Sequence, residues 1–454
     1  MAEAASRKPN IIWIFGDQHR GSALSCMQDP NVNTPHIDRM GRLGVHFPAA
    51  VAGFPLCCPF RGSLLSGRYP HRAVTGHEVQ LDPSLPTVAE PFKQAGYHTA
   101  YIGKWHLDGF KERNGRAAHH TVPPERRGGF DTWVGFENNN NQWDCWVHGG
   151  QDDHAFHEKL PGYETDCLTD IMIDYIQQSV TTEDGQVDED YQPFFAVLSV
   201  QPPHNPFLAE AEWMADHNPA KVELRPNVPV AEPIARRARE ELAGYYAQIE
   251  NLDWNVGRVL DTLAELGVED DTYIVFFSDH GELAGSHGQF RKMSPYNEAI
   301  GIPFFINRGN TSYGHWGGRI PNVPINHVDI APTSLGLAGI DVPDWMEGTD
   351  YSGLFHGKRG DYPDSAYLQV IEPTGHGDSV DKPWRGIVTT DGWKYVCFEN
   401  MPFLMFDMNN DPYEQANLAH NSKYYDKHRQ LLQRLREWVE STGDSFALPE
   451  DPGR

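Results

Sequence analysis

The chain has 454 residues, of which 39% are hydrophobic, and its 63 acidic residues outnumber 37 basic ones to give a formal net charge of -26. This length and composition are typical of a folded globular protein with a sizeable buried core. The strong negative charge argues against nucleic acid and anionic membranes as partners, and no apolar run is long enough to cross a bilayer.

Short apolar runs rich in β-branched and aromatic residues predict buried strands. They cover residues 10–17, 98–104, 194–200, 272–279 and 302–306. Helices are predicted between them, over residues 34–44, in a segment that ends at Gly96, and over residues 235–266. Strands that alternate with helices favour a mostly parallel sheet covered by helices on both faces.

The pattern changes after about residue 339. Residues 364–371, 385–398 and 403–408 predict antiparallel strands, with a hairpin turn at Asp391-Gly392, and residues 425–441 predict a final helix. We therefore expect an α/β domain over residues 1–350 and a smaller α+β subdomain over residues 351–454.

The six cysteines follow no disulfide or zinc pattern. Cys57 and Cys58 are adjacent, the other four are scattered, and there is no C-x-x-C. Such usage is typical of reduced thiols, and the first ten residues lack the apolar segment of a secretory signal. We expect a cytoplasmic protein, unless a signal sequence has been removed.

Polar side chains collect where four predicted strands end, and ligands of an open parallel sheet bind beyond this edge. These residues are Asp17, Gln18, Lys104, His106, His204, Asp279 and His280. Each alone has a structural alternative: a carboxylate that caps a helix, a surface amide, or a buried histidine with a satisfied hydrogen bond. Their joint appearance at one edge favours a functional site.

The chemistry of this set is divided between metal ligands and cations. Asp17 and Asp279 offer hard oxygen ligands, which suit Ca²⁺ or Mg²⁺ better than Zn²⁺, and Gln18 and His280 can add to them. The basic residues Lys104, His106 and His204 would favour an anion. Lys292 follows the Asp279 loop and can join them, although it can equally be a surface lysine, with Arg291 as an adjacent competitor.

The adjacent cysteines open a short motif. Residues 57–61 fit C-x-P-x-R when Cys57 is the first member, whereas Cys58 does not fit, because Gly62 stands four residues after it. The run that follows can form a helix, whose N-terminus offers free N–H groups to an anion. The alternative is a buried cysteine pair at the start of a helix.

These motifs together resemble the formylglycine-dependent (type I) sulfatases of the alkaline-phosphatase superfamily. The family's signature is similar to CCPFRGSLLSGR, and its further motifs are similar to NIIWIFGDQHR, YIGKWHL, PPHNPF and SDHGELAGSHGQFRKMSPYNE, in the same order. The resemblance implies an alkaline-phosphatase-like sandwich: a large, mostly parallel central sheet flanked by helices, and a C-terminal subdomain with an antiparallel sheet and a terminal helix.

The resemblance also implies a mechanism. A maturation enzyme would oxidise Cys57 to Cα-formylglycine, whose hydrated aldehyde attacks the sulfur of a sulfate ester, and sulfate leaves as the aldehyde re-forms. One divalent metal would be held by the modified cysteine and by the aligned ligands Asp17, Gln18, Asp279 and His280. Gln18 stands where many members have a second aspartate, so the expected Ca²⁺ has Mg²⁺ and Mn²⁺ as alternatives.

The remaining aligned residues would act on the formylglycine and the sulfate. The resemblance implies that Arg61 orients the formylglycine and that His106 helps to deprotonate the diol. Lys104, His204 and Lys292 would hold the sulfate oxygens. Either His204 or Lys292 would protonate the leaving oxygen.

The substrate is expected to be a sulfated carbohydrate. Residues 137–157 are rich in Asn, Trp and His, which suit sugar hydroxyls and ring faces, although an ordinary long loop is the alternative. Residues 77–79 and 374–385 are further candidates to line the pocket. The other functions considered are an aryl or choline sulfatase, a phosphonate monoester or phosphodiester hydrolase, and an inactive binder of sulfated glycans.

Overall fold

The apolar runs of the sequence form the centre of a nine-stranded sheet, in the order β2-β9-β8-β1-β7-β3-β4-β5-β6. The computed structural model describes residues 7–111, 117–309, 318–375 and 377–453. The strands of this sheet are β1 (Asn10–Gly16), β2 (Val45–His46), β3 (His98–Lys104), β4 (Thr132–Phe136), β5 (Trp146–Gly149), β6 (Phe156–Lys159), β7 (Phe194–Val200), β8 (Thr272–Ser278) and β9 (Phe304–Arg308).

The parallel part of the sheet is its centre. Strands β8, β1, β7, β3 and β4 run parallel to one another, whereas β9 pairs antiparallel with β8, and β2 with β9. At the other edge β4, β5 and β6 follow one another through short connections and pair antiparallel, as short connections require. The predicted α/β architecture is confirmed, with a mixed rather than purely parallel sheet.

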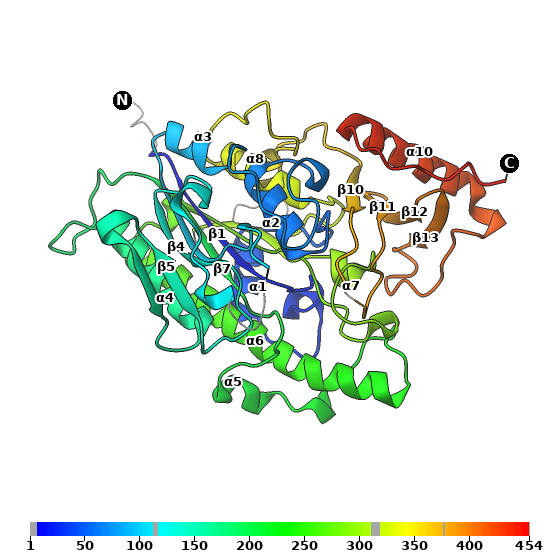
Figure 1. Cartoon of the computed structure of the whole chain (residues 1–454), viewed down its shortest axis with the longest axis horizontal. Helices are drawn as coiled ribbons and strands as arrows, with labels where there is room; N and C mark the ends of the chain where they lie inside the picture. The colour runs from blue at the N-terminus through cyan, green and yellow to red at the C-terminus, as the bar shows by residue number, and fades with distance from the viewer. Residues whose placement is uncertain (1–6, 112–116, 310–317, 376, 454) are drawn as a thin grey trace.

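Helices cover both faces of this sheet (Figure 1). One face carries α2 (Cys57–Ser66), α3 (Ala89–Gln94) and α8 (Ile330–Leu337), and the other carries α1 (Pro35–Leu43), α4 (Glu164–Val180) and α6 (Glu232–Glu265). The predicted helices over 34–44 and 235–266 correspond to α1 and α6. Three short helices complete the described chain before its C-terminal helix: α5 (Ala211–Asp216), α7 (Asn297–Ile300) and α9 (Ser352–Phe355).

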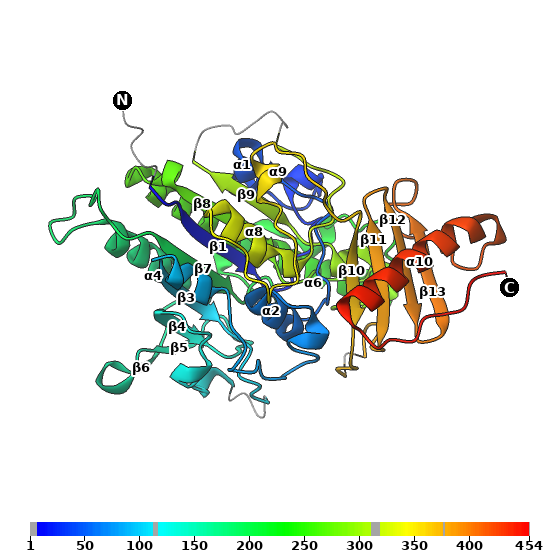
Figure 2. The ribbon, with the colours of Figure 1, turned by 90° about the horizontal axis from the view of Figure 1, so that it is seen from above.

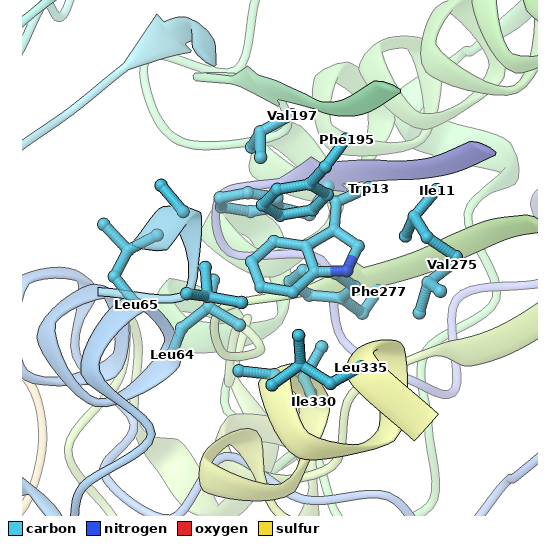
Figure 3. Close-up of a cluster of buried hydrophobic side chains, with 14 of the residues drawn as sticks. Ile11, Trp13, Leu64, Leu65, Phe195, Val197, Val275, Phe277, Ile330 and Leu335 are labelled. Atoms are coloured by element: carbon cyan, nitrogen blue, oxygen red, sulfur yellow. The ribbon is translucent and has the colours of Figure 1, made fainter. Parts of the chain in front are cut away.

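Successive side chains of a strand point to opposite faces, so each central strand feeds two cores. On β1, Ile11 and Trp13 pack under the α2 and α8 layer, whereas Ile12 and Ile14 pack under α1, α4 and α6. Figure 3 shows Trp13 surrounded by side chains from β7, β8, α2 and α8. Its indole Nε1 donates to Ser334 Oγ at 2.8 Å, which satisfies its buried donor.

A second, antiparallel sheet follows in the C-terminal part of the chain. Its strands β10 (Ser365–Val370), β11 (Trp384–Thr389), β12 (Trp393–Phe398) and β13 (Met401–Asp407) pair in chain order. Helix α10 (Tyr425–Thr442) lies across one face of this sheet (Figure 2). The other face packs on Val51, Phe54 and Met293 of the larger part. The domain boundary near residue 350 stays a prediction.

No helix in the described ranges is both long and apolar enough to cross a membrane.

Candidate active site

Four neighbouring parallel strands bring the predicted polar residues to one edge of the sheet. Strands β8, β1, β7 and β3 are adjacent and parallel, so their carboxyl ends lie together. Asp17 follows β1 and Asp279 follows β8, and both side chains are completely buried. Cys57 is the first residue of α2, which ends at Gly67 in a left-handed conformation with φ of 66°. Cys57 Sγ contacts both Asp17 and His280, so the helix start faces the edge where the strands end.

Four donors form a compact group at this edge. The donor atoms of Asp17, Cys57, Asp279 and His280 all lie within 4.8 Å of one another. Cys57 Sγ is 3.4 Å from Asp17 Oδ1 and 3.3 Å from His280 Nε2. Asp279 Oδ1 accepts hydrogen bonds from the backbone N–H groups of Gln18 and His280, at 2.9 and 2.8 Å.

This group fits a hard divalent cation. Asp279 Oδ2 is buried and accepts no hydrogen bond from the described residues, so this oxygen is available to a cation. Burial and the charge of Asp17 raise the pKa of Asp279 to about 7. Two carboxylates with one imidazole are an oxygen-rich set, and a cation would compensate the proximity of their charges.

Gln18 lies beside the four donors, in a left-handed conformation with φ of 75°. Its Nε2 donates to Glu282 Oε2 at 2.6 Å, and its Oε1 accepts from Lys292 Nζ at 3.2 Å. The buried Glu282 thus fixes which end of the amide faces the site. Sequence reasoning missed Glu282, although it stands only two residues after His280.

Three cations surround the carboxylates. Lys104 Nζ lies 2.7 Å from Asp17 Oδ2, and Lys292 Nζ lies 3.3 Å from Cys57 Sγ. Arg61 Nη2 lies 3.3 Å from Asp17 Oδ2. All three cationic side chains are buried, so their charge acts at short range on a group held beside Cys57.

Burial and these charges set the protonation of the site. Burial alone would raise the pKa of Asp17, but Lys104 and neighbouring positive groups outweigh it and hold the pKa well below its usual range. Burial, with the charge of Asp17, raises the pKa of the Cys57 thiol to about 11. Burial and Lys292 hold the pKa values of His204 and His280 well below the usual range, so both imidazoles are neutral.

The loop after β3 holds His106 next to the site. His106 is buried and has a φ of 55°, in the left-handed region. The backbone N–H groups of Leu107 and Asp108 donate to the buried carboxylate of Glu137, at 3.0–3.1 Å. Burial and Lys104 hold the pKa of His106 well below its usual range. Glu137 lies at the end of β4. The sequence analysis did not predict its contact with this loop.

Ser199 is another residue that was missed. Its Oγ accepts a hydrogen bond from Arg61 Nη1 at 2.8 Å, and the carbonyl oxygen of Lys104 accepts a second from the same nitrogen at 2.7 Å. These bonds fix the guanidinium against Asp17. A polar residue near the end of the apolar run of β7 was the available signal.

The predicted pocket segments have different positions. His204 is half-buried, and Gln142 Nε2 donates to Pro206 O at 3.2 Å, so residues 137–144 border the loop that carries His204. The rest of the 137–157 segment is not one loop, because it includes β5 and the start of β6. His77 adjoins Cys58, with 4.0 Å between Nδ1 and Sγ.

The 374–385 segment lies against the loop that carries Lys292. Its Asp378 carbonyl accepts from Phe290 N at 3.1 Å, and Val380 N donates to Ser294 Oγ at 2.8 Å. Arg385 is buried in β11 and pairs with Asp444, so it does not line the pocket. His376 lies outside the described residues.

The mixed α/β sandwich, the donor group at its edge and the antiparallel C-terminal sheet define an enzyme of the alkaline-phosphatase superfamily. A family model described as Sulfatase matches residues 9–340, and one described as N-sulphoglucosamine sulphohydrolase, C-terminal, matches residues 285–441. The chain belongs to the sulfatase family and is a sulfuric ester hydrolase.

A curated relative agrees with this membership, and solved structures share the fold. An ulvan-active sulfatase from Formosa agariphila is 34% identical over 454 residues, which cover 97% of this chain and 82% of the relative. The crystal structure of yidJ from Bacteroides fragilis has a TM-score of 0.83 and 25% identity, and covers 98% of this chain and 99% of its own. A structure in complex with its substrate D-glucosamine-2-N,6-O-disulfate has a TM-score of 0.81 and 24% identity, and covers 97% of this chain and 99% of its own.

Proposed function

We propose that this sulfatase hydrolyses a sulfate ester of a carbohydrate, with Cys57 converted by a maturation enzyme to a formylglycine nucleophile beside one divalent cation. The observation that carries the proposal is the position of Cys57 at the start of α2, with Lys292 Nζ and His280 Nε2 each 3.3 Å from its sulfur. A group built on this side chain would meet metal ligands on one side and a lysine on the other.

Asp17, Asp279 and His280 are the proposed metal ligands from the strand ends, with Gln18 beside them. When bound, the cation supplies Lewis-acid chemistry, which stabilises negative charge that develops on oxygen next to it. We expect Ca²⁺, because carboxylate oxygens dominate the set, with Mg²⁺ or Mn²⁺ as alternatives.

The cations of the chain are proposed to bind the sulfate group. Lys104 contacts Asp17 and Lys292 contacts Cys57, so both are placed to meet an anion at the nucleophile. Arg61 contacts Asp17 and is proposed to orient the modified Cys57. These buried charges also offset the repulsion that a chain of net charge -26 exerts on an anionic substrate.

Neutral histidines are the proposed groups for proton transfer. His106 is proposed to accept the proton whose loss expels sulfate, and its neutral imidazole is the form that can accept it. His204 or Lys292 is proposed to donate a proton to the leaving alcohol. His204 is half-buried, which leaves it more accessible to the alcohol part of the ester than the fully buried groups of the site.

Two observations support a carbohydrate ester. Residues 137–144 border the His204 loop, and Trp143 there is 39% exposed, so part of an aromatic side chain is accessible to a sugar. The relative from Formosa agariphila is named for activity on ulvan. Small aryl or choline sulfates and phosphonate esters are the competing substrates.

The first experiment is peptide mass spectrometry of residues 50–70, on protein co-expressed with a formylglycine-generating enzyme. We expect Cys57 to lose sulfur and gain oxygen, while Cys58 stays a thiol. An unmodified Cys57 under these conditions would refute the formylglycine nucleophile.

The second experiment compares initial rates of the modified protein on four substrates: a sulfated disaccharide, an aryl sulfate, choline sulfate and a phosphonate monoester. We expect the highest kcat/KM on a sulfated sugar. Faster turnover of either small sulfate would refute the carbohydrate assignment alone, and preference for the phosphonate would refute the sulfate-ester assignment as the main activity.

A further inference from the structure

A second donor cluster lies around Cys58, the next residue of α2. Donor atoms of Cys58, His77 and His106 all lie within 4.8 Å of one another, and Cys58 Sγ is 4.0 Å from His77 Nδ1. Cys58 and His106 are buried and His77 is half-buried. The cluster shares no residue with the group formed by Asp17, Cys57, Asp279 and His280.

The chemistry of this cluster differs from that of its neighbour. One thiol and two imidazoles contain no oxygen donor, so they suit a soft or borderline ion such as Zn²⁺, whereas the carboxylate-rich group suits Ca²⁺. The Nδ1 of His106 is buried and has no hydrogen-bond partner among the described residues.

Glu78 supplies the outer contacts that a metal site of this kind needs. Its backbone N–H donates to Cys58 Sγ at 3.4 Å, which stabilises negative charge on the sulfur. Its Oε1 lies 3.8 Å from His77 Nε2, at ion-pair rather than hydrogen-bond distance. A carboxylate this close acts on the imidazole electrostatically and raises its basicity.

We propose that Cys58, His77 and His106 bind Zn²⁺ or a similar ion, with a fourth coordination position open to water, and that this binding inhibits the enzyme. Binding breaks the S–H bond of Cys58, forms a metal–thiolate bond and releases the thiol proton to solvent. Inhibition follows because the ion occupies His106, and this inhibitory role rests on the proposed function. The binding of the ion does not depend on the proposed function.

The binding test uses Co²⁺ as a spectroscopic substitute for Zn²⁺, on Ca²⁺-loaded protein. We expect thiolate-to-Co²⁺ absorption that Zn²⁺ abolishes by displacement. Cys58→Ser should remove the absorption. It should also weaken Zn²⁺ binding at least tenfold, because loss of an outer contact to a metal ligand already weakens binding about tenfold or more and loss of the ligand itself should weaken it further. Cys57→Ala and the matched control Cys26→Ser, at a half-buried cysteine that belongs to neither cluster, should keep the absorption.

Further variants and an activity assay complete the test. Glu78→Gln keeps all three donors and should weaken Zn²⁺ binding about tenfold, which gives a readout if Cys58→Ser does not fold. Zn²⁺ should inhibit sulfate release by wild-type protein at concentrations at least tenfold lower than it inhibits Cys58→Ser.

The outcomes separate this site from the proposed function. Absence of the absorption in wild-type protein, or its persistence in Cys58→Ser, would overturn the site, even if the protein is an active sulfatase. Equal inhibition of wild type and Cys58→Ser would overturn the inhibitory role and assign inhibition to the Asp17 group. A protein with no sulfatase activity would still test the site through absorption.

Discussion

Two adjacent cysteines have different environments because neighbouring residues of a helix point about 100° apart. Cys57 Sγ faces Lys292 and His280 at 3.3 Å, whereas Cys58 Sγ faces His77 at 4.0 Å. The chain thus presents one cysteine to the Asp17 group and the other to a separate cluster. Their roles can be tested one at a time.

We predict that Cys57→Ala abolishes sulfate release and leaves the fold intact, because the proposed nucleophile is lost and a small buried side chain is truncated. The matched control Cys58→Ala should keep much of the activity. Sulfate release and thermal unfolding of protein co-expressed with the maturation enzyme measure both. An active Cys57→Ala protein would contradict the mechanism. If Cys58→Ala alone were inactive, the nucleophile would have been assigned to the wrong cysteine.

Glu137 illustrates positioning by a residue that touches no substrate. Its carboxylate accepts hydrogen bonds from the backbone of the loop that holds His106 in a left-handed conformation. In Glu137→Gln the amide NH₂ would face a backbone donor. We predict a decrease in kcat of about ten- to a hundredfold through displacement of His106, with a smaller change in KM.

Steady-state kinetics on a sulfate ester measure this effect. The control Glu90→Gln alters an exposed glutamate on α3 and should change neither constant. A Glu137→Gln enzyme with unchanged kcat would show that His106 keeps its place without this carboxylate, or has no part in turnover.

At the scale of elements, the backbone of β3 at Gly103 would direct a side chain into its neighbour β7. Gly103 has a φ of 109°, and a Cβ built there would lie 1.9 Å from the carbonyl oxygen of Ser199. The two residues are paired in the sheet, and next to them Ser199 Oγ contacts Arg61 and Lys104 contacts Asp17. The strand pair therefore positions the site as well as the core.

We predict that Gly103→Ala lowers the free energy of unfolding by about 3 kcal/mol or more, because backbone strain and a backbone clash add. The matched control is Gly96→Ala, where φ is 83° and nothing lies within 4 Å of the new Cβ. It should cost only about 1–2 kcal/mol, from backbone strain alone. Urea unfolding measures both, and equal losses would contradict the clash.

At the scale of the whole molecule, a buried charge network joins the small sheet to the larger part. Lys394 on β12 forms an ion pair with Glu414, and its Nζ donates to Pro295 O at 2.8 Å. Trp384 Nε1 donates to Met293 O at 2.9 Å. The C-terminal sheet thereby braces the segment that follows Lys292, so it contributes to the site without lining it.

We predict that Lys394→Met lowers the free energy of unfolding by about 3–5 kcal/mol, because Glu414 stays buried without its cation. The control is Lys427→Met, whose partner Asp391 has a side chain that is 59% exposed. It should cost at most about 1 kcal/mol. Urea unfolding at neutral pH measures both, and a Lys394→Met loss as small as that of the control would contradict the role of the network.

Sequence alone determined the strands β1, β3, β7 and β8, the helices α1, α6 and α10, and the group at the strand ends, whereas it predicted neither β4 nor α4. Alternation and apolar runs are local properties, and parallel strands carry their last residues to a common edge, so Asp17, Lys104 and Asp279 could be placed together before any coordinates. The C-x-P-x-R spacing likewise selected Cys57 over Cys58.

Only the tertiary structure decided which side chains meet within this edge. The contacts of Gln18 with Glu282, of the His106 loop with Glu137, and of Cys58 with His77 join different loops and helices. The antiparallel pairing at the two edges of the large sheet also depends on where the chain between two strands re-enters the sheet. Such contacts are set by the packing of the whole chain, because no local pattern of residues records which distant backbone or side chain will lie alongside.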